Sequence, residues 1–161
     1  MTELTQARLK QLLSYDPLTG LFTRLVGRSG GGKAGSIAGC AKTYFEIKID
    51  GVGYLAHRLA WLYMTGSWPA EDIDHEDTDK HNNRWLNLRE ATDSQNRANI
   101  PVQKNNKLGV KGVSPHRGKF RTSIRVNGKG ITLGNYNTIS EASAVYERAA
   151  SIGFGKFARV A

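Results

Sequence analysis

The feature that most constrains the fold is a strand pattern followed by a turn and a capped helix in the last third of the chain. From Lys119 to Val126 the side chains alternate in character, which is typical of a strand with one buried face. Asn127-Gly128 matches the two-residue turn of a β-hairpin, and Ile131 to Leu133 supplies a returning strand. Thr138 and Glu141 have capping-box spacing, so we expect a helix to follow.

The two faces of this predicted strand suit different partners. One face is expected to pack against the helix, and it presents Phe120, Thr122, Ile124 and Val126. The other face is polar and basic, and it presents Lys119, Arg121, Ser123 and Arg125. The pattern therefore predicts a small antiparallel sheet with one face on a helix and the other in solvent.

The first part of the chain carries weaker but readable signals. Apolar residues at helical spacing predict a helix from Thr2 to Ser14, and Leu21 to Val26 is expected to be a strand. Alternation from Tyr44 to Ile49, followed by Asp50-Gly51, predicts a second hairpin. The segment Ala56 to Thr65 is predicted to be a buried helix, which Gly66 and Pro69 end.

A polar segment divides the chain. Residues 100–108 contain Pro101 and paired asparagines without apolar periodicity, so we interpret them as a linker. A length of 161 residues allows two small domains. We therefore predict an α+β protein with a first domain over residues 1–99 and a second over residues 109–161.

Charge is unevenly distributed along the chain, whose net charge is +9. Residues 101–161 contain 11 Lys and Arg but only 2 Asp and Glu, a balance that favours a polyanionic partner. Residues 70–100 reverse the balance, with 8 acidic and 4 basic side chains. Because acidic groups repel phosphate unless a cation lies between them, this contrast indicates metal-assisted chemistry on nucleic acid.

The segment from Ile73 to Asn96 contains the side chains for such chemistry. An apolar residue before Asp74-His75, a polar loop, an Asn-Leu-Arg strand and a helix opening near Thr92 or Asp93 predict a strand, strand, helix unit. Asp74 and Asn96 offer the hard oxygen ligands that Mg²⁺ or Mn²⁺ prefers. His75 is suited to take a proton from water at neutral pH.

This segment resembles the HNH, or ββα-metal, nuclease motif, and in particular its phage and intron-encoded homing endonuclease branch. The preceding YDPLTGLF and IDGVGYLAHRLAWLYMTG and the following LREATDSQNRAN extend the resemblance over roughly residues 10–100. It implies a ββα-metal domain that hydrolyses phosphodiester bonds of double-stranded DNA with Mg²⁺ or Mn²⁺. Asp74 and Asn96 would bind the metal, His75 would be the general base, and Asn87 would position the site.

The region after residue 108 resembles the apetala/ethylene-response-factor DNA-binding domain of plants, which also accompanies phage HNH nucleases. The resemblance rests on Gly112-Val113, Gly118-Lys119-Phe120, Ile124-Arg125, LGNY at 133–136 and EASAVY at 141–146. It implies a three-stranded sheet that contacts the DNA major groove, with one helix behind it. The implied DNA-binding residues are Lys111, Arg117, Lys119, Arg121, Ser123, Arg125 and Thr132.

Other interpretations of these residues remain open. An EF-hand over the acidic loop is disfavoured, because Asn82 and Leu88 stand where that loop needs Gly and Glu. His57 is either a packed histidine or a further member of the site. A DNA-binding regulator without catalysis is the main alternative function, and an RNA-binding or RNA-cleaving protein is a third.

Cellular location and assembly are constrained only broadly. No apolar run reaches the length of a membrane span, and the N-terminus lacks the apolar core of a secretory signal. A single cysteine, Cys40, permits no internal disulfide. We therefore expect a cytoplasmic protein, phage-encoded and acting in the host cell, with no membrane partner; monomer and homodimer stay open.

Overall fold

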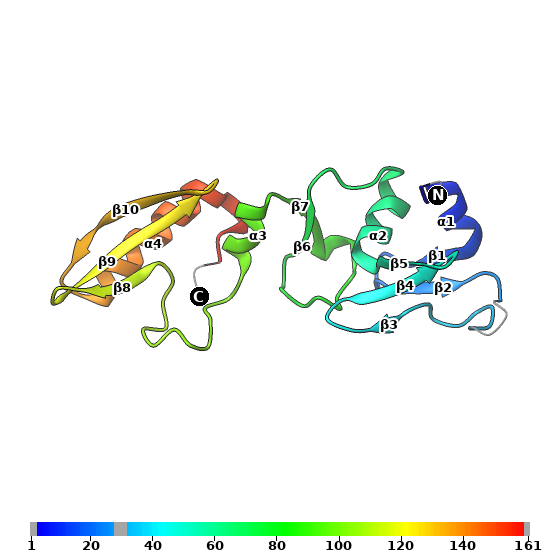
Figure 1. Ribbon diagram of the computed structural model, residues 1–161, viewed down its shortest axis with the longest axis horizontal. Helices are drawn as coiled ribbons and strands as arrows, with labels where there is room; N and C mark the ends of the chain where they lie inside the picture. Colours follow the sequence, from blue (N-terminus) through cyan, green and yellow to red (C-terminus); the bar gives the residue numbers. More distant parts are fainter. Residues whose placement is uncertain (1–2, 28–31, 160–161) are drawn as a thin grey trace. The chain divides into compact units, whose positions relative to one another are not determined.

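A computed structural model describes residues 3–27 and 32–159 of the chain. It mixes helices with small antiparallel sheets, which agrees with the predicted α+β class. The chain divides into two compact units, Met1–Glu90 and Ala91–Ala161 (Figure 1). Within the described ranges, no helix combines the length and apolar character needed to cross a bilayer.

The first unit begins with α1 and continues through short strands to the central helix α2. Its elements are α1 (Gln6–Leu12), β1 (Leu13–Tyr15), β2 (Phe22–Arg24), β3 (Cys40–Ala41), β4 (Phe45–Ile49), β5 (Val52–Leu55), α2 (Ala56–Thr65), β6 (Asp72–His75), the 3₁₀ turn η1 (Trp85–Asn87) and β7 (Leu88–Ala91). β1 pairs with β2, β4 lies between β3 and β5, and β6 pairs with β7. The unit therefore contains three small separate sheets rather than one continuous layer.

The core of this unit follows the predicted local signals. Asp50 and Gly51 have positive φ angles of 46° and 88°, as a tight turn between β4 and β5 requires. The helix α2 has the predicted bounds and ends where Gly66 adopts a left-handed conformation. Leu59 and Leu62 of α2 are buried with apolar residues of α1, β1, β2 and β4, so α2 anchors the core.

The second unit is a three-stranded sheet with helices. Its elements are α3 (Asp93–Asn99), β8 (Val113–His116), β9 (Lys119–Val126), β10 (Lys129–Tyr136), α4 (Ile139–Phe154) and the 3₁₀ turn η2 (Gly155–Phe157). β9 is central and antiparallel to both neighbours. Asn127 and Gly128 have φ angles of 48° and 78°, and the capping box of Thr138 and Glu141 opens α4. The predicted hairpin and capped helix are thus confirmed.

The sheet packs on α4 through the predicted face of β9. Thr122 and Ile124 are buried, and the Thr122 hydroxyl donates to the Ala142 carbonyl at 3.1 Å. Gly112, with φ 64°, approaches so closely that a Cβ there would lie 2.1 Å from the Tyr146 ring. Any larger residue would separate β8 from the helix, which explains the glycine at this position.

Two boundaries differ from the sequence expectations. The predicted helix from Thr2 to Ser14 is too long, because the backbone becomes extended at Leu13 and pairs with Arg24; Thr2 lies outside the described residues. The compact units divide at Glu90, whereas the predicted linker lies at 100–108. Helix α3 groups with the second unit because Ala98 packs in that unit's core. The functional domain limits at residues 99 and 109 stay a prediction.

Candidate functional site

Asp74 and His75 are adjacent residues at the end of β6, and both are only 5% exposed. Successive side chains of a strand point to opposite faces, so the two residues have different partners. Asp74 pairs with β7, whereas His75 contacts the loop that connects the two strands. The strand thus carries a buried carboxylate on one face and a buried imidazole on the other.

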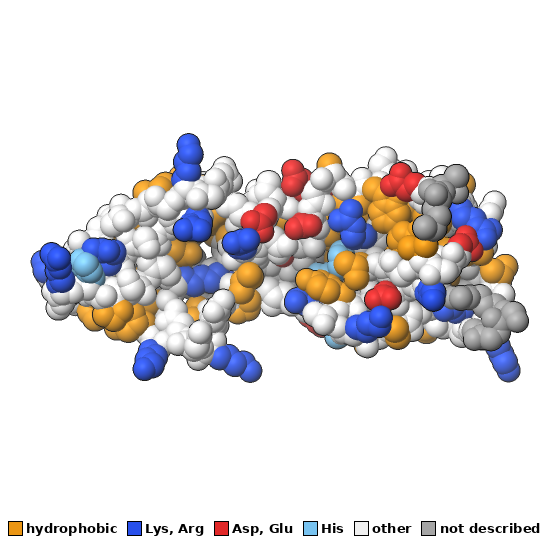
Figure 2. Space-filling view, in the orientation of Figure 1, with side chains coloured by type: hydrophobic (Ala, Val, Ile, Leu, Met, Phe, Trp, Pro, Cys, Tyr) orange, Lys and Arg blue, Asp and Glu red, His pale blue; other side chains and the backbone are white. Residues whose placement is uncertain are grey.

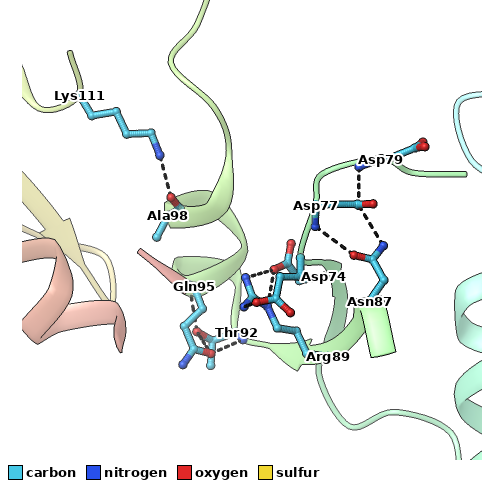
Figure 3. A network of polar contacts seen from close by, with 10 residues as sticks. Asp74, Asp77, Asp79, Asn87, Arg89, Thr92, Gln95, Ala98 and Lys111 are labelled. Atoms are coloured by element: carbon cyan, nitrogen blue, oxygen red, sulfur yellow. Dashed lines mark hydrogen bonds and ion pairs between the residues drawn. The ribbon is translucent and has the colours of Figure 1, made fainter. Parts of the chain in front are cut away.

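The Asp74 carboxylate is paired with the guanidinium of Arg89 on β7 (Figure 3). Nε and Nη2 of Arg89 each lie 2.9 Å from Asp74 Oδ2, and Nη1 lies 3.4 Å from Glu76 Oε1. Arg89 is 9% exposed. A buried carboxylate of this kind requires a positive partner, because burial without one is strongly unfavourable. The site therefore favours a cation at Asp74.

Asn87 fixes the loop of residues 76–87, called loop 76–87 below. Its side-chain oxygen accepts from the Asp77 amide at 3.0 Å, and its Nδ2 donates to Asp77 Oδ1 (Figure 3). The same Nδ2 also donates to the Asn82 carbonyl. Burial alone would raise the pKa of Asp77, but hydrogen bonds from Asn82, Asn87 and the Asp79 amide lower it overall. Asn87 thus ties the end of the loop to its start and to its middle.

Asn83 of the same loop contacts His75 directly. The distance from His75 Nε2 to Asn83 Oδ1 is 3.1 Å, and Asn83 is 3% exposed. The backbone carbonyl of Asn83 accepts from the buried Tyr15 hydroxyl at 2.7 Å. The sequence analysis assigned no role to Asn83 or Tyr15, and no local pattern marks a contact across 68 residues.

His57 lies beside His75 within an aromatic group. The two imidazole centroids are 5.0 Å apart, and the Tyr44 ring is 5.2 Å from His57. Burial, followed by the charges of His75 and Arg58, lowers the pKa of His57 to about 3. His57 is therefore neutral at physiological pH and packs beside His75, as the first of its two interpretations expects; membership of the site stays a prediction.

Asn96, the second predicted metal ligand, is half-buried on α3 in the second unit. Thr92 caps the helix, which begins at Asp93, and the side chains of Thr92 and Gln95 form a capping box (Figure 3). The convergence of Asn96 with Asp74 on one cation stays a prediction.

The outer face of the second unit's sheet carries most of the predicted DNA contacts. Lys119, Ser123 and Arg125 are exposed on β9, and exposed Thr132 pairs with Ser123 across the sheet. Arg117 is exposed in the turn between β8 and β9. Figure 2 shows Lys and Arg side chains gathered with a histidine at the end of the unit where this turn lies.

Two predicted DNA-binding residues make contacts of their own. The half-buried Arg121 directs Nη2 toward Nε2 of His116 on β8. The Lys111 ammonium donates to the Ala98 carbonyl at 2.7 Å (Figure 3). It also donates to the Arg159 carbonyl at 2.7 Å. Burial, then the charge of Arg159, lowers the pKa of Lys111. Lys111 therefore has a structural role in the second unit, and its contact with DNA stays a prediction.

Arg89 is a contact residue of Asp74 that the sequence analysis missed. A signal was present, because an arginine between apolar residues of a mostly buried strand, Leu88–Ala91, needs an anionic partner. Asp74 is the buried carboxylate on the paired strand β6. Reading charge across neighbouring strands would have connected the two residues.

Comparisons with known proteins agree with the geometry of β6, loop 76–87 and β7. Residues 54–98 match the family described as HNH endonuclease. The chain is 35% identical over 119 residues to an uncharacterised HNH endonuclease of Acanthamoeba polyphaga mimivirus, covering 73% of this chain and 62% of that protein. No solved structure matches the chain with significance. The segment that carries Asp74, His75 and Asn87 is thus similar to HNH endonucleases.

Proposed function

We propose that the chain is a metal-dependent endonuclease that hydrolyses phosphodiester bonds of double-stranded DNA. The observation that carries this proposal is the buried Asp74-His75 pair on β6, inside the segment that matches HNH endonucleases. A carboxylate and an imidazole of this kind suit nuclease activity. They are followed by a loop that Asn87 fixes.

His75 is the proposed general base, and Asn87 is the proposed positioning residue. His75 would take a proton from water as the water oxygen attacks phosphorus. Asn87 keeps loop 76–87 folded over the end of β6 through its bonds to Asp77 and Asn82. Proton transfer requires that the base and the water lie within hydrogen-bond distance. A fixed loop favours that geometry.

A divalent cation fits the chemistry of Asp74. This carboxylate already pairs with a positive group, the Arg89 guanidinium. Among the described residues, no cluster of three or more His, Cys, Asp or Glu side chains could hold a metal ion without other ligands. We propose that Asp74 and the Asn96 amide hold the ion, an oxygen donor set that suits Mg²⁺ or Mn²⁺. When bound, the ion would neutralise charge that develops on the scissile phosphate and the leaving oxygen.

We further propose that the basic sheet face of the second unit binds the DNA. Its residues are Arg117, Lys119, Arg121, Ser123, Arg125 and Thr132, to which the plant-type resemblance adds Lys111. Neutralising phosphates releases counterions, so the affinity should fall steeply with salt. Arg121 and Arg125 are the residues proposed to contact guanine, because a guanidinium can form two hydrogen bonds to that base. Homing and a phage origin remain part of this proposal; the relative named above is viral.

The decisive experiment incubates the full chain with supercoiled plasmid in Mg²⁺ and in EDTA. We expect nicked plasmid only with the metal, and a loss of about 10²-fold or more in His75→Ala, because a general base contributes on that scale. His81→Ala is the matched control, since His81 is an exposed histidine of the same loop. Binding without cleavage by the wild-type chain would instead favour the DNA-binding regulator.

A further inference from the structure

The outer face of the second unit's sheet places a histidine beside one of the proposed DNA-binding arginines. His116 is the last residue of β8, and Nη2 of Arg121 on β9 is directed toward its Nε2. Both side chains are half-buried. A guanidinium has only donors, so the imidazole nitrogen that faces it must accept the hydrogen bond. His116 is thus an acceptor for the guanidinium of Arg121.

The other neighbours of Arg121 do not hold its side chain. Ser114 on β8 and Asn135 on β10 are its partners in register, and both are exposed. Within the described part of the chain, neither forms a side-chain hydrogen bond with Arg121, and the buried Nε of Arg121 has no partner. An arginine that extended into solvent would hydrate this donor, so leaving it unpaired is costly. The cost indicates that the guanidinium is kept in one place.

The contact with His116 orients Arg121 without neutralising it. Residues 101–161 contain two acidic residues, Glu141 and Glu147, and both lie on α4, which packs on the opposite face of the sheet. An ion pair with a carboxylate would cancel the charge of the guanidinium, whereas a hydrogen bond to an imidazole leaves that charge available for DNA. The arrangement therefore suits an arginine that contacts a polyanion.

The remaining donors of Arg121 match the edge of a base. A guanidinium has five N–H groups in a planar fork. His116 takes one of the two on Nη2 and the Nε donor is buried, so both N–H groups of Nη1 and the second of Nη2 remain for a ligand. We propose that His116 is a positioning residue that holds the Nη1 and Nη2 edge of Arg121 toward O6 and N7 of a guanine. This inference rests on the proposed function, in which the sheet face binds DNA.

The expected benefit of the contact is sequence discrimination. An arginine that is already oriented loses less side-chain entropy when it binds. A phosphate accepts hydrogen bonds from many directions, whereas a base edge accepts only near its own plane. Loss of the His116 imidazole should therefore weaken binding to a preferred sequence and leave binding to unrelated sequences nearly constant.

Nitrogen-15 NMR of the full chain tests the contact without DNA. A guanidinium that is held in place rotates slowly about its C–N bonds, so its Nη groups give separate signals, and Arg121→Ala identifies those of Arg121. We expect separate signals in the wild-type chain and in His116→Gln, whose amide oxygen can accept in the same place. His116→Leu should give averaged signals. Averaged signals in the wild-type chain would overturn the inference.

A double-mutant cycle with DNA tests the function of the contact. The probe is a labelled duplex that the wild-type chain selects from a random pool, and a duplex of scrambled sequence is the comparison; fluorescence anisotropy in EDTA measures both. His116→Leu should raise the Kd for the selected duplex about fivefold, the size of one net hydrogen bond, and the Kd for the scrambled duplex less than about twofold. In the Arg121→Ala background the same change should have almost no effect, because His116 acts through Arg121.

Ser114→Ala is the matched control, because Ser114 is the β8 residue in register with Arg121 and should change neither Kd. An equal loss with and without Arg121, or an equal loss on the scrambled duplex, would contradict the inference. If His116→Leu does not fold, the NMR signals of the wild-type chain and of His116→Gln still decide. A wild-type chain that selects no duplex would reject the proposed DNA-binding face, whereas selection together with averaged Arg121 signals would reject the inference alone.

Discussion

Polar side chains are buried around loop 76–87, whereas they are exposed on the outer sheet face. Around loop 76–87, Asp74, His75 and Asn83 are each at most 5% exposed and have defined polar partners. On the sheet face, Lys119, Ser123 and Arg125 are exposed. Buried polar groups cost stability when a partner is lost, whereas exposed cations cost almost none. Substitutions in the first region should therefore change folding, and those in the second only binding.

The largest expected effect comes from Arg89→Leu. Removing the guanidinium from the buried Asp74 carboxylate should lower the free energy of unfolding of the first unit by about 3–5 kcal/mol. Urea unfolding followed by tryptophan fluorescence measures this unit selectively, because all three tryptophans, Trp61, Trp68 and Trp85, belong to it. Arg84→Leu, an exposed change in the same loop, is the control. Equal midpoints for the two variants would remove the contrast between buried and exposed charge.

The second effect is a pH dependence of the same unit. The pKa of His57 is lowered from 6.5 to about 3 in the folded state, so the unfolded state binds more protons between these values. The free energy of unfolding should therefore fall as the pH drops from about 6.5 toward 3. We expect a smaller loss than in Arg89→Leu, because local opening can hydrate the imidazole before the unit unfolds.

The control for this pH dependence is His57→Leu, which replaces the titrating group with an apolar side chain. Its unfolding free energy should vary less over the same interval than that of the wild-type chain. Parallel curves for the two proteins, measured by tryptophan fluorescence, would show that other groups cause the acid sensitivity.

The smallest effect on folding is expected for Arg125→Ala. The side chain is exposed on β9, so the thermal midpoint should stay nearly constant while DNA affinity falls by about 1–3 kcal/mol. Fluorescence anisotropy with labelled duplex at several salt concentrations measures both the affinity and its salt slope. Arg148→Ala on the exposed surface of α4 is the control. An equal loss of affinity in both variants would move the DNA contact away from the sheet face.

The sequence analysis named some members of the buried polar group around loop 76–87 and missed others, for a physical reason. Asp74 and His75 could be identified because the chemistry of neighbouring carboxylate and imidazole groups is written in adjacent positions. Arg89 and Asn83 were missed because their roles depend on partners across a strand pair and across a loop. The sequence showed the carboxylate and the imidazole but not the side chains that contact them.

By itself, the sequence determined the elements whose start and stop signals are local. Helix Ala56–Thr65 and strand Lys119–Val126 have the predicted bounds, because Gly66 and Asn127-Gly128 end them through backbone conformations that few other residues adopt. The tertiary structure alone decided the long-range partnerships, such as Tyr15 with Asn83. Such contacts arise only after apolar burial brings distant segments together, and no residue pattern along the chain encodes their direction.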